Sequence, residues 1–169
     1  MPGGFFKRLL FFVSLVLAGA AGFFVVSKLL DGAPKAQLLS RDKPATQSNI
    51  YPDYGPRFGN DGVRETFFHT HNEENPFWQV DLGAVHKITQ VSLFNRNIAQ
   101  ERALNCVILT SDDGKEWTEI YANAGRPFGD GNGAGEPRHV KVSAKGRYVR
   151  VQIKGKGILH LSEVEVFGY

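Results

Sequence analysis

The chain is poor in cysteine. Cys106 is the only one, so no intrachain disulfide can form. It lies in the apolar run 105–110, which is typical of a strand and favours a buried thiol over a nucleophile. An exported domain without disulfides depends on its hydrophobic core alone, which is more typical of bacterial than of animal secreted proteins.

Most of the chain has no excess of positive or of negative charge. Residues 1–35 hold four Lys or Arg and one Asp, whereas residues 36–169 hold sixteen Lys or Arg and sixteen Asp or Glu. The net charge of +3 therefore belongs to the N-terminal segment and does not indicate nucleic acid binding. Within the neutral part, residues 138–156 (the basic segment) carry seven Lys or Arg and no acid. They form either a solvated strand face or a surface for an anionic lipid or glycan.

Sequence patterns that indicate catalysis are also missing. The chain has no Gly-Lys-Ser/Thr phosphate loop, no serine elbow, and no Cys/His dyad with an orienting partner. The adjacent Glu73 and Glu74 would diverge on a strand rather than face a substrate as an acid/base couple. The sequence therefore predicts a binding protein and not an enzyme.

One long hydrophobic run is present, at the N-terminus. Residues 9–27 contain no charge, which is enough to cross a hydrocarbon core of roughly 30 Å as a helix. A cleaved signal peptide is the alternative, because Ala18-Gly-Ala20 has the small residues that a signal peptidase accepts. The apolar run continues to Val26, past that point, and this favours an uncleaved anchor.

The N-terminal charges predict the orientation of this anchor. Lys7 and Arg8 precede the run, which favours a cytoplasmic N-terminus and places the rest of the chain in the periplasm or outside the cell. The predicted segments are a cytoplasmic tail at 1–8, a transmembrane signal anchor at 9–30, a tether at 31–42 and a β-sandwich domain at 43–169.

From residue 44 onward, short apolar runs alternate with Gly, Pro and Asp turns, and no helical periodicity is sustained. In residues 148–153, Val149, Val151 and Ile153 alternate with polar residues, as in a half-buried strand. This spacing predicts an all-β sandwich or barrel. The expected strands are 77–82, 88–95, 105–111, 118–122, 138–142, 148–153 and 159–167.

Seven short motifs occur in an order that resembles the discoidin domain family, which includes coagulation factor V/VIII type C domains, F-type lectins and bacterial carbohydrate-binding modules. This resemblance implies a jelly-roll β-sandwich that binds ligands at its loops. The motifs are KPATQS at 43–48, GNDG at 59–62, NPFWQVDLG at 75–83, NR at 95–96, SDDGKEW at 111–117, GRYVR at 146–150 and LHLSEVEV at 159–166.

The resemblance to F-type lectins implies a structural Ca²⁺ site. Asp61 and Glu163 match the family's carboxylate ligands, and a hard cation that prefers six to eight oxygens would take the rest from carbonyls. In the alternative interpretation, Asp61 belongs to a turn and Glu163 is a solvated strand residue. The implied carbonyl ligands are those of Phe58, Val63, Thr66 and Ser162.

The same resemblance implies a sugar site. His69 precedes Arg96 by twenty-seven positions, and Arg102 follows, as in the fucose-binding members. An imidazole and two guanidiniums would bind hydroxyls, and Phe67 or Phe68 would offer an apolar face to the sugar ring.

An alternative remains for these arginines, which could instead pair with Glu101, Glu73 or Glu74 as surface ion pairs. Ile98 stands where the family has an Asp, the loop is one residue shorter and it lacks cysteines, so fucose specificity is not predicted.

The sequence as a whole predicts a membrane-anchored, non-catalytic module that binds a glycan beside a Ca²⁺ ion. The alternative is a module that docks a protein or an anionic lipid. The loop tips are expected to be polar or rich in glycine, which argues against insertion into lipid.

Overall fold

The computed structural model describes residues 34–131 and 135–169. They belong to the unit Pro34–Tyr169, which holds every strand named below. The predicted anchor at 9–30 lies outside the described residues. Within them, no helix has the length and hydropathy needed to cross a bilayer.

The described residues form strands and short 3-10 helices only, which confirms the all-β prediction. Two strands, β5 and β8, are much longer than the rest. The elements are β1 (Gln37–Leu38), β2 (Ala45–Gln47), η1 (Pro56–Gly59), β3 (Phe68–His69), β4 (Glu73–Glu74), β5 (Phe77–Phe94), η2 (Gln100–Ala103), β6 (Cys106–Ser111), β7 (Thr118–Ala122), β8 (Arg138–Ile153), β9 (Lys156–Gly157), β10 (His160–Leu161) and β11 (Glu163–Gly168).

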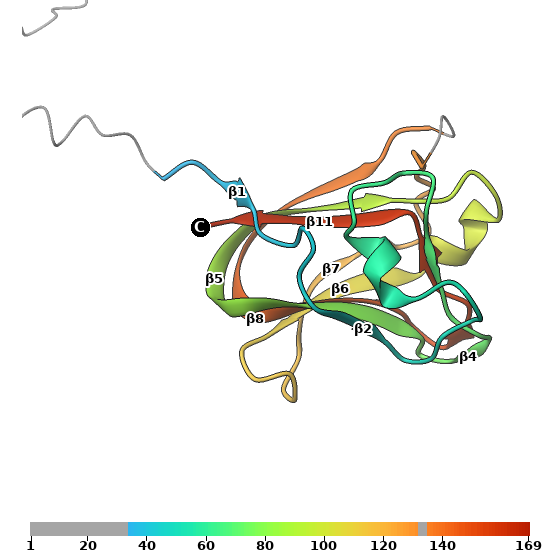
Figure 1. The fold of residues 1–169 in the computed structure, drawn as a ribbon, viewed down its shortest axis with the longest axis horizontal. Coiled ribbons are helices and arrows are strands. Elements are labelled where there is room, and N and C mark those ends of the chain that lie inside the picture. The colour runs from blue at the N-terminus through green and yellow to red at the C-terminus, as the bar shows by residue number, and fades with distance from the viewer. Residues whose placement is uncertain (1–33, 132–134) are drawn as a thin grey trace, which may run out of the picture. The chain divides into compact units, whose positions relative to one another are not determined.

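The main sheet has the strand order β1-β11-β5-β8-β6-β7, with β2 also paired to β5. In Figure 1, β5 and β8 bend from the layer that contains β11 into the layer that contains β2, β6 and β7, so both strands serve both layers of the sandwich. Two small pairs, β10 with β3 and β4 with β9, lie off this sheet.

Because of these bends, strands that were predicted separately are continuous in the structure. The predicted strands 77–82 and 88–95 are one strand, β5, whose pairing with β8 shifts register between Asp81 and His86. Gly83 lies in this shift with φ +89, a conformation that favours glycine. The glycine-containing stretch therefore allows the strand to turn the corner between layers without ending it.

The predicted tether also belongs partly to the sheet. β1 pairs with β11, Leu39 packs against the core, and the Ser40 hydroxyl accepts a hydrogen bond of 2.9 Å from the amide of Val166. The folded domain therefore begins by Gln37 rather than at residue 43, because these contacts fix the chain before β2.

The core lies between the layers and is made of the inward residues of both. Val149, Val151 and Ile153 are buried, as their alternation predicts. Trp78 is also buried, against Phe68, whereas Trp117 lies at the sheet surface under the guanidinium of Arg150, 3.8 Å from its ring centre. The other large core residues are Val80, Ile88, Val91, Leu93, Ile108, Leu159, Leu161, Val164 and Val166.

Cys106 is buried in this core, as the sequence predicts. Burial raises the pKa of its thiol to about 12. The thiolate that a nucleophile requires is therefore absent at neutral pH, and Cys106 acts as a small apolar side chain.

Candidate functional site

The small β3–β10 pair provides the frame of the candidate site. The antiparallel register places His69 opposite His160 and Phe68 opposite Leu161. Because neighbouring residues on a strand face opposite sides, Phe68 and Leu161 enter the core, where both are fully buried. The two histidines lie on the other face of the pair.

The two imidazoles stack across this pair, with ring centres 5.5 Å apart and planes inclined by 11°. His160 is only 1% exposed, and its ring nitrogens form no hydrogen bond of good geometry among the described residues, although the backbone of Ala99 lies close enough to raise its pKa slightly. Burial, followed by the charges of Arg96, His69 and Arg102, lowers the pKa of His160 to about 3. This imidazole is therefore neutral at physiological pH and supports His69 as a flat surface.

Two arginines reach His69 from neighbouring segments. Arg102, in η2, brings Nη1 to 3.4 Å from Nε2 of His69. A guanidinium has donors and no acceptor, so this contact requires a lone pair on Nε2 and leaves the His69 proton on Nδ1. Burial first, and then the charges of Arg102 and Arg96, lower the pKa of His69, which agrees with a neutral ring.

Aromatic side chains complete the cluster. The guanidinium carbon of Arg96 lies 3.6 Å above the ring centre of Phe67, and Tyr54 stacks on Phe67 at 4.4 Å. Tyr51 contacts the rings of His69 and His71 at 4.9 Å and 5.1 Å. The site thus combines hydrogen-bond donors with apolar ring faces, the usual lining of a small-molecule site.

Gln47 fixes the loop that carries the tyrosines. Its side-chain amide donates to the carbonyl of Asn49 at 2.6 Å and to that of His69 at 2.9 Å. Backbone hydrogen bonds from Tyr51 to His69 and from His69 to Tyr54 close the loop further. The candidate site is therefore held by the backbone as well as by side-chain packing.

The structure brings together His69, Arg96 and Arg102, as the sequence predicts. Phe68 does not join them, because its ring is 0% exposed and packs on Trp78. The aromatic face belongs to its neighbour Phe67, so the prediction for Phe68 is corrected.

Sequence reasoning missed three members of the site, His160, Tyr51 and Tyr54. His160 lies between two buried leucines, Leu159 and Leu161. A polar residue inside an apolar strand is the signal that could have identified it. The tyrosines precede the predicted strands and left no comparable signal.

Neither site arginine has a carboxylate partner among the described residues. The alternative pairs with Glu101, Glu73 and Glu74 are not formed within this part of the chain. The ion pairs there are Arg41–Glu163, Arg64–Glu165, Arg147–Asp81 and Lys154–Glu119.

A second polar group surrounds Glu163, at the start of β11. Its side chain is 1% exposed, so it is not the solvated strand residue of the alternative interpretation. Oε2 accepts a hydrogen bond of 3.1 Å from the amide of Gly62, and Arg41 lies 4.0 Å from Oε1. Burial raises the pKa of Glu163 to about 7, and the neighbouring Asp61 acts in the same direction.

Asp61 forms the turn that the sequence allows. Its carboxylate accepts hydrogen bonds of 2.9 Å from the amide of Val63 and from the hydroxyl of Thr66. Among the described residues, no three His, Cys, Asp or Glu side chains converge as metal ligands. A cation at Asp61 and Glu163 would therefore need carbonyl oxygens, and a buried carboxylate whose pKa stays raised in spite of Arg64 and Arg41 fits such a cation.

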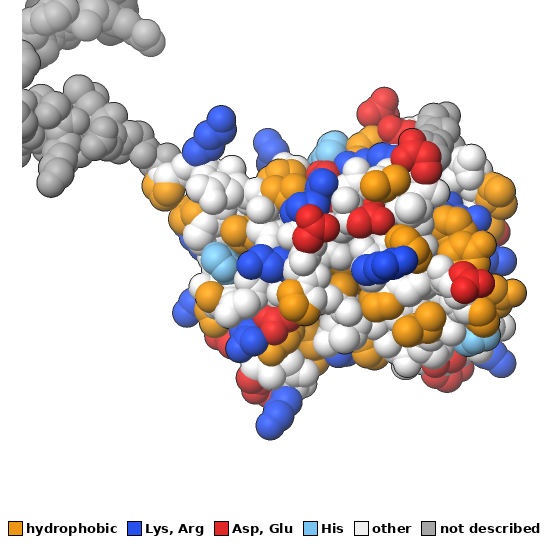
Figure 2. Space-filling view, in the orientation of Figure 1, with side chains coloured by type: hydrophobic (Ala, Val, Ile, Leu, Met, Phe, Trp, Pro, Cys, Tyr) orange, Lys and Arg blue, Asp and Glu red, His pale blue; other side chains and the backbone are white. Residues whose placement is uncertain are grey.

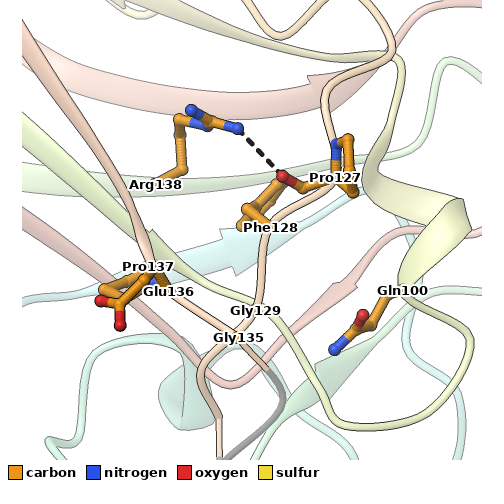
Figure 3. Close-up of a pocket in the computed structure, with 8 residues that line it drawn as sticks. All are labelled: Gln100, Pro127, Phe128, Gly129, Gly135, Glu136, Pro137 and Arg138. Atoms are coloured by element: carbon orange, nitrogen blue, oxygen red, sulfur yellow. Dashed lines mark hydrogen bonds between the residues drawn. The ribbon is translucent and has the colours of Figure 1, made fainter.

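A cleft of about 360 Å³ lies elsewhere, beside η2 and the start of β8. Figure 3 shows that its polar groups do not converge, because the guanidinium of Arg138 turns to the carbonyl of Pro127 at 3.0 Å. Gln100 and Glu136 lie on opposite sides of the cleft. This arrangement offers no common point for a ligand.

The basic segment is partly neutralised within the domain. Arg147 binds Asp81 through two hydrogen bonds of 2.7 Å, which lower the pKa of that carboxyl. Lys154 pairs with Glu119 at 2.7 Å. In Figure 2, acidic and basic side chains are intermixed on the visible face. These contacts favour the interpretation of the basic segment as a solvated strand face.

The loop tips are less polar than expected. Ile50 is 53% exposed and Ile98 is 62% exposed. They lie on the loops that carry Tyr51 and Arg96, so apolar side chains border the candidate site. Hydrophobic side chains gather in Figure 2 at the end of the domain that carries η2.

Comparisons with known proteins identify the family. The model of the F5/8 type C domain matches residues 44–164. Fucolectin-1 of Anguilla japonica is 35% identical over 136 residues, which cover 72% of this chain and 75% of that protein. The crystal structure of a fucolectin from Morone saxatilis superposes with a TM-score of 0.70 at 26% identity, over 78% of this chain and 47% of that one.

A fucose binding module of Streptococcus pneumoniae superposes with a TM-score of 0.66 at 26% identity, over 79% of this chain and 96% of the module. This chain thus spans less than half of the Morone saxatilis lectin and nearly the whole of the bacterial module. The predicted discoidin resemblance is confirmed, and the chain belongs to the F5/8 type C domain family.

Proposed function

We propose that this protein is a non-catalytic module that binds carbohydrate at the cluster of His69, Arg96 and Arg102. The observation that carries the proposal is the convergence of these side chains, from three separate segments, beside the rings of Phe67 and Tyr51. The similarity to fucolectins and to a fucose binding module supports it.

The chemistry of the cluster suits a pyranose. Arg96 and Arg102 supply N–H donors to hydroxyl and ring oxygens, and His69 keeps its Nε2 lone pair directed at Arg102. Tyr51, which is 44% exposed, offers a ring face to the C–H patch of a sugar, whereas Phe67 is stacked between Arg96 and Tyr54 and holds the guanidinium of Arg96 in place. Recognition then depends on hydrogen bonds and ring contacts, with no bond made or broken.

We further propose that Asp61 and Glu163 hold a structural Ca²⁺ ion, with carbonyls of Phe58, Val63, Thr66 and Ser162 as further ligands. The buried carboxylate of Glu163 and the Asp61 turn supply the support for this proposal. The ion would join the loop at residues 61–66 to the start of β11. That loop leads directly to Phe67, so calcium would stabilise the sugar site.

The anchor at 9–30 and display in the periplasm or outside the cell also remain proposals. Their support is the uncharged N-terminal run with Lys7 and Arg8 before it. One such domain would bind a sugar weakly, and many copies in a membrane plane would raise the avidity.

The test is a glycan array probed with the full chain in mild detergent, with Ca²⁺ or with a chelator. His69→Ala and Arg96→Ala should lose saturable binding, whereas Lys141→Ala, an exposed site on β8, should retain it. A folded chain that binds no glycan would refute the carbohydrate proposal. Binding that is unaffected by the chelator would refute a role for calcium.

The exposed Ile50 and Ile98 favour a second candidate, docking to an anionic membrane. Apolar loop tips beside unpaired arginines could insert between headgroups. Flotation with phosphatidylserine vesicles of the domain without its N-terminal segment separates the two functions. Membrane docking requires vesicle binding that is lost in Ile98→Asp, whereas a sugar-binding module should not associate with the vesicles.

A further inference from the structure

We propose that the site selects an anionic saccharide, one that carries a carboxylate or a sulfate, over its neutral counterpart. The inference rests on the proposed carbohydrate function and names the ligand class. It follows from the charges that converge on His69 and from the lack, among the described residues, of a carboxylate paired with them.

The positive charges of the site are fixed. Arg96 and Arg102 remain protonated at any physiological pH, and both lie near His69, which contacts Arg102 at 3.4 Å. The guanidinium of Arg96 lies 3.6 Å above the ring centre of Phe67, and the phenol of Tyr54 raises the pKa of Arg96. Elsewhere in the described domain, an arginine such as Arg147 is satisfied by a carboxylate through two short hydrogen bonds.

Most of the donors in the two guanidiniums remain available. Arg96 donates no side-chain hydrogen bond to another described residue, and Arg102 makes one long contact, to His69. Glu101 is exposed and adjacent to Arg102 in η2, yet forms no ion pair within the described part of the chain. Among the described residues, the geometry thus leaves two planar donor groups with no carboxylate acceptor, the arrangement that binds a carboxylate or a sulfate through paired hydrogen bonds.

The electrostatics of the neighbouring groups agree with this arrangement. Burial first, and to a smaller extent the charge of Arg102, lower the pKa of Arg96, and both arginines lower the pKa of His69 and of His160. No carboxylate is among the causes of these shifts, and the phenol of Tyr54 raises the pKa of Arg96. Each group senses positive charge from its neighbours, so a bound anion would relieve repulsion that a neutral ligand leaves in place.

The inference also explains the neutral histidine pair. His160 is buried beneath His69, and among the described residues its nitrogens form no hydrogen bond of good geometry. It adds a rigid surface without adding charge, so that the anion is bound by the arginines and the sugar ring contacts Tyr51. His160 is thus a positioning residue for His69.

The experiment compares matched saccharides that differ at one carbon. Binding of the full chain to oligosaccharides of galactose, galacturonic acid and galactose 6-sulfate is measured by calorimetry at 50 mM and 300 mM NaCl. We expect the carboxylated or the sulfated ligand to bind on the order of tenfold to a hundredfold more tightly than galactose. Because the two charges are partly exposed, this preference should shrink at the higher salt concentration.

Substitutions test whether the preference for an anionic saccharide arises at the arginines of this site. Arg96→Gln and Arg102→Gln should abolish it, and Arg102→Lys should restore part of it, since the charge returns without the planar donor pair. Lys141→Gln removes the same charge from an exposed position on β8 and should change nothing. Arg102→Gln should also raise Tm in the absence of ligand, because it removes a like-charge neighbour of Arg96.

The outcomes separate the two proposals. A neutral sugar that binds as tightly as its acidic counterpart, with binding lost in the arginine variants, would overturn the anionic preference and leave carbohydrate binding intact. The absence of binding to every saccharide would overturn both. A preference that survives in both glutamine variants would place the anion elsewhere and refute the inference, and a preference for sulfate over carboxylate would support it and identify the source of the charge.

Discussion

The buried imidazole of His160 predicts a specific dependence of stability on pH. We consider His160→Leu, which replaces the ring by an apolar side chain and removes two buried ring nitrogens from the interior. At pH 7.5 the unfolded and folded states both hold His160 neutral. The variant should then be as stable as the parent or more stable by about 1 kcal/mol, because no buried polar atom remains unsatisfied.

The difference should grow as the pH falls. The folded pKa of His160 is lowered to about 3 from an ordinary value of 6.5, chiefly by burial and then by Arg96, His69 and Arg102. Below pH 6.5 the His160 ring becomes protonated in the unfolded parent but stays neutral in the folded parent. The parent therefore loses stability as the pH falls to about 3. At roughly 1.4 kcal/mol per pH unit, the leucine variant should gain about 2 kcal/mol on the parent between pH 7.5 and pH 5.

Urea unfolding of residues 34–169 at pH 7.5 and pH 5, followed by tryptophan fluorescence, measures this difference. Trp78 is fully buried and reports on the core. Phe67→Leu, which alters the site without changing a titratable group, is the control and should show the same difference at both pH values. A stability difference for His160→Leu that does not change with pH, or one that shrinks at pH 5, would refute the assignment of a buried neutral imidazole.

Other substitutions test the calcium proposal, the core and the loop. Glu163 has a pKa raised to about 7 by burial, so its contribution to stability is lost as the pH rises through 7. Glu163→Gln should therefore be more stable than the calcium-free parent at pH 8, by roughly 3 kcal/mol in chemical denaturation, and its Tm should not respond to added Ca²⁺. Phe68→Ala removes a core ring and should cost about 3–5 kcal/mol in the same assay, whereas Phe67→Ala should weaken sugar binding with a stability loss of about 1 kcal/mol or less. Gln47→Ala frees the carbonyls of Asn49 and His69 and should lower sugar affinity and Tm together, in calorimetry and in thermal melts; an unchanged affinity would contradict its role in the loop.

Local sequence patterns were sufficient to predict the longer strands, but not the two-residue strands β1, β3, β4 and β9 or the way in which the strands connect. The alternation of Val149, Val151 and Ile153 is a property of the strand itself, and the structure buries these residues as predicted. The bends of β5 and β8 depend on packing between layers. The predicted strands therefore leave gaps at 83–87 and 143–147, which contain Gly83 and Gly146, where the folded chain continues as one strand.

In the candidate site, too, some features could be predicted from local sequence and others depend on pairing between distant segments. The spacing of His69, Arg96 and Arg102 predicted their convergence through the family resemblance, and the structure places them together. The choice between Phe67 and Phe68 could not be made from the sequence, because β3 has only two residues. Its orientation is set by pairing with β10, a segment about ninety positions later in the chain.

The segment 160–163 connects the two proposed sites and contains one buried, ionisable side chain from each. His160 supports the sugar site from below, and Glu163, three residues later, faces the loop at Asp61. Both side chains are buried polar groups whose burial shifts the pKa against the charged form, which a sequence optimised for stability alone would avoid. Calcium at Glu163 would fix the start of β11, and β10 is held to β3 through the His69–His160 pair. Loss of calcium should therefore weaken sugar binding by two routes. One is the backbone of residues 160–163, and the other is the loop that leads to Phe67.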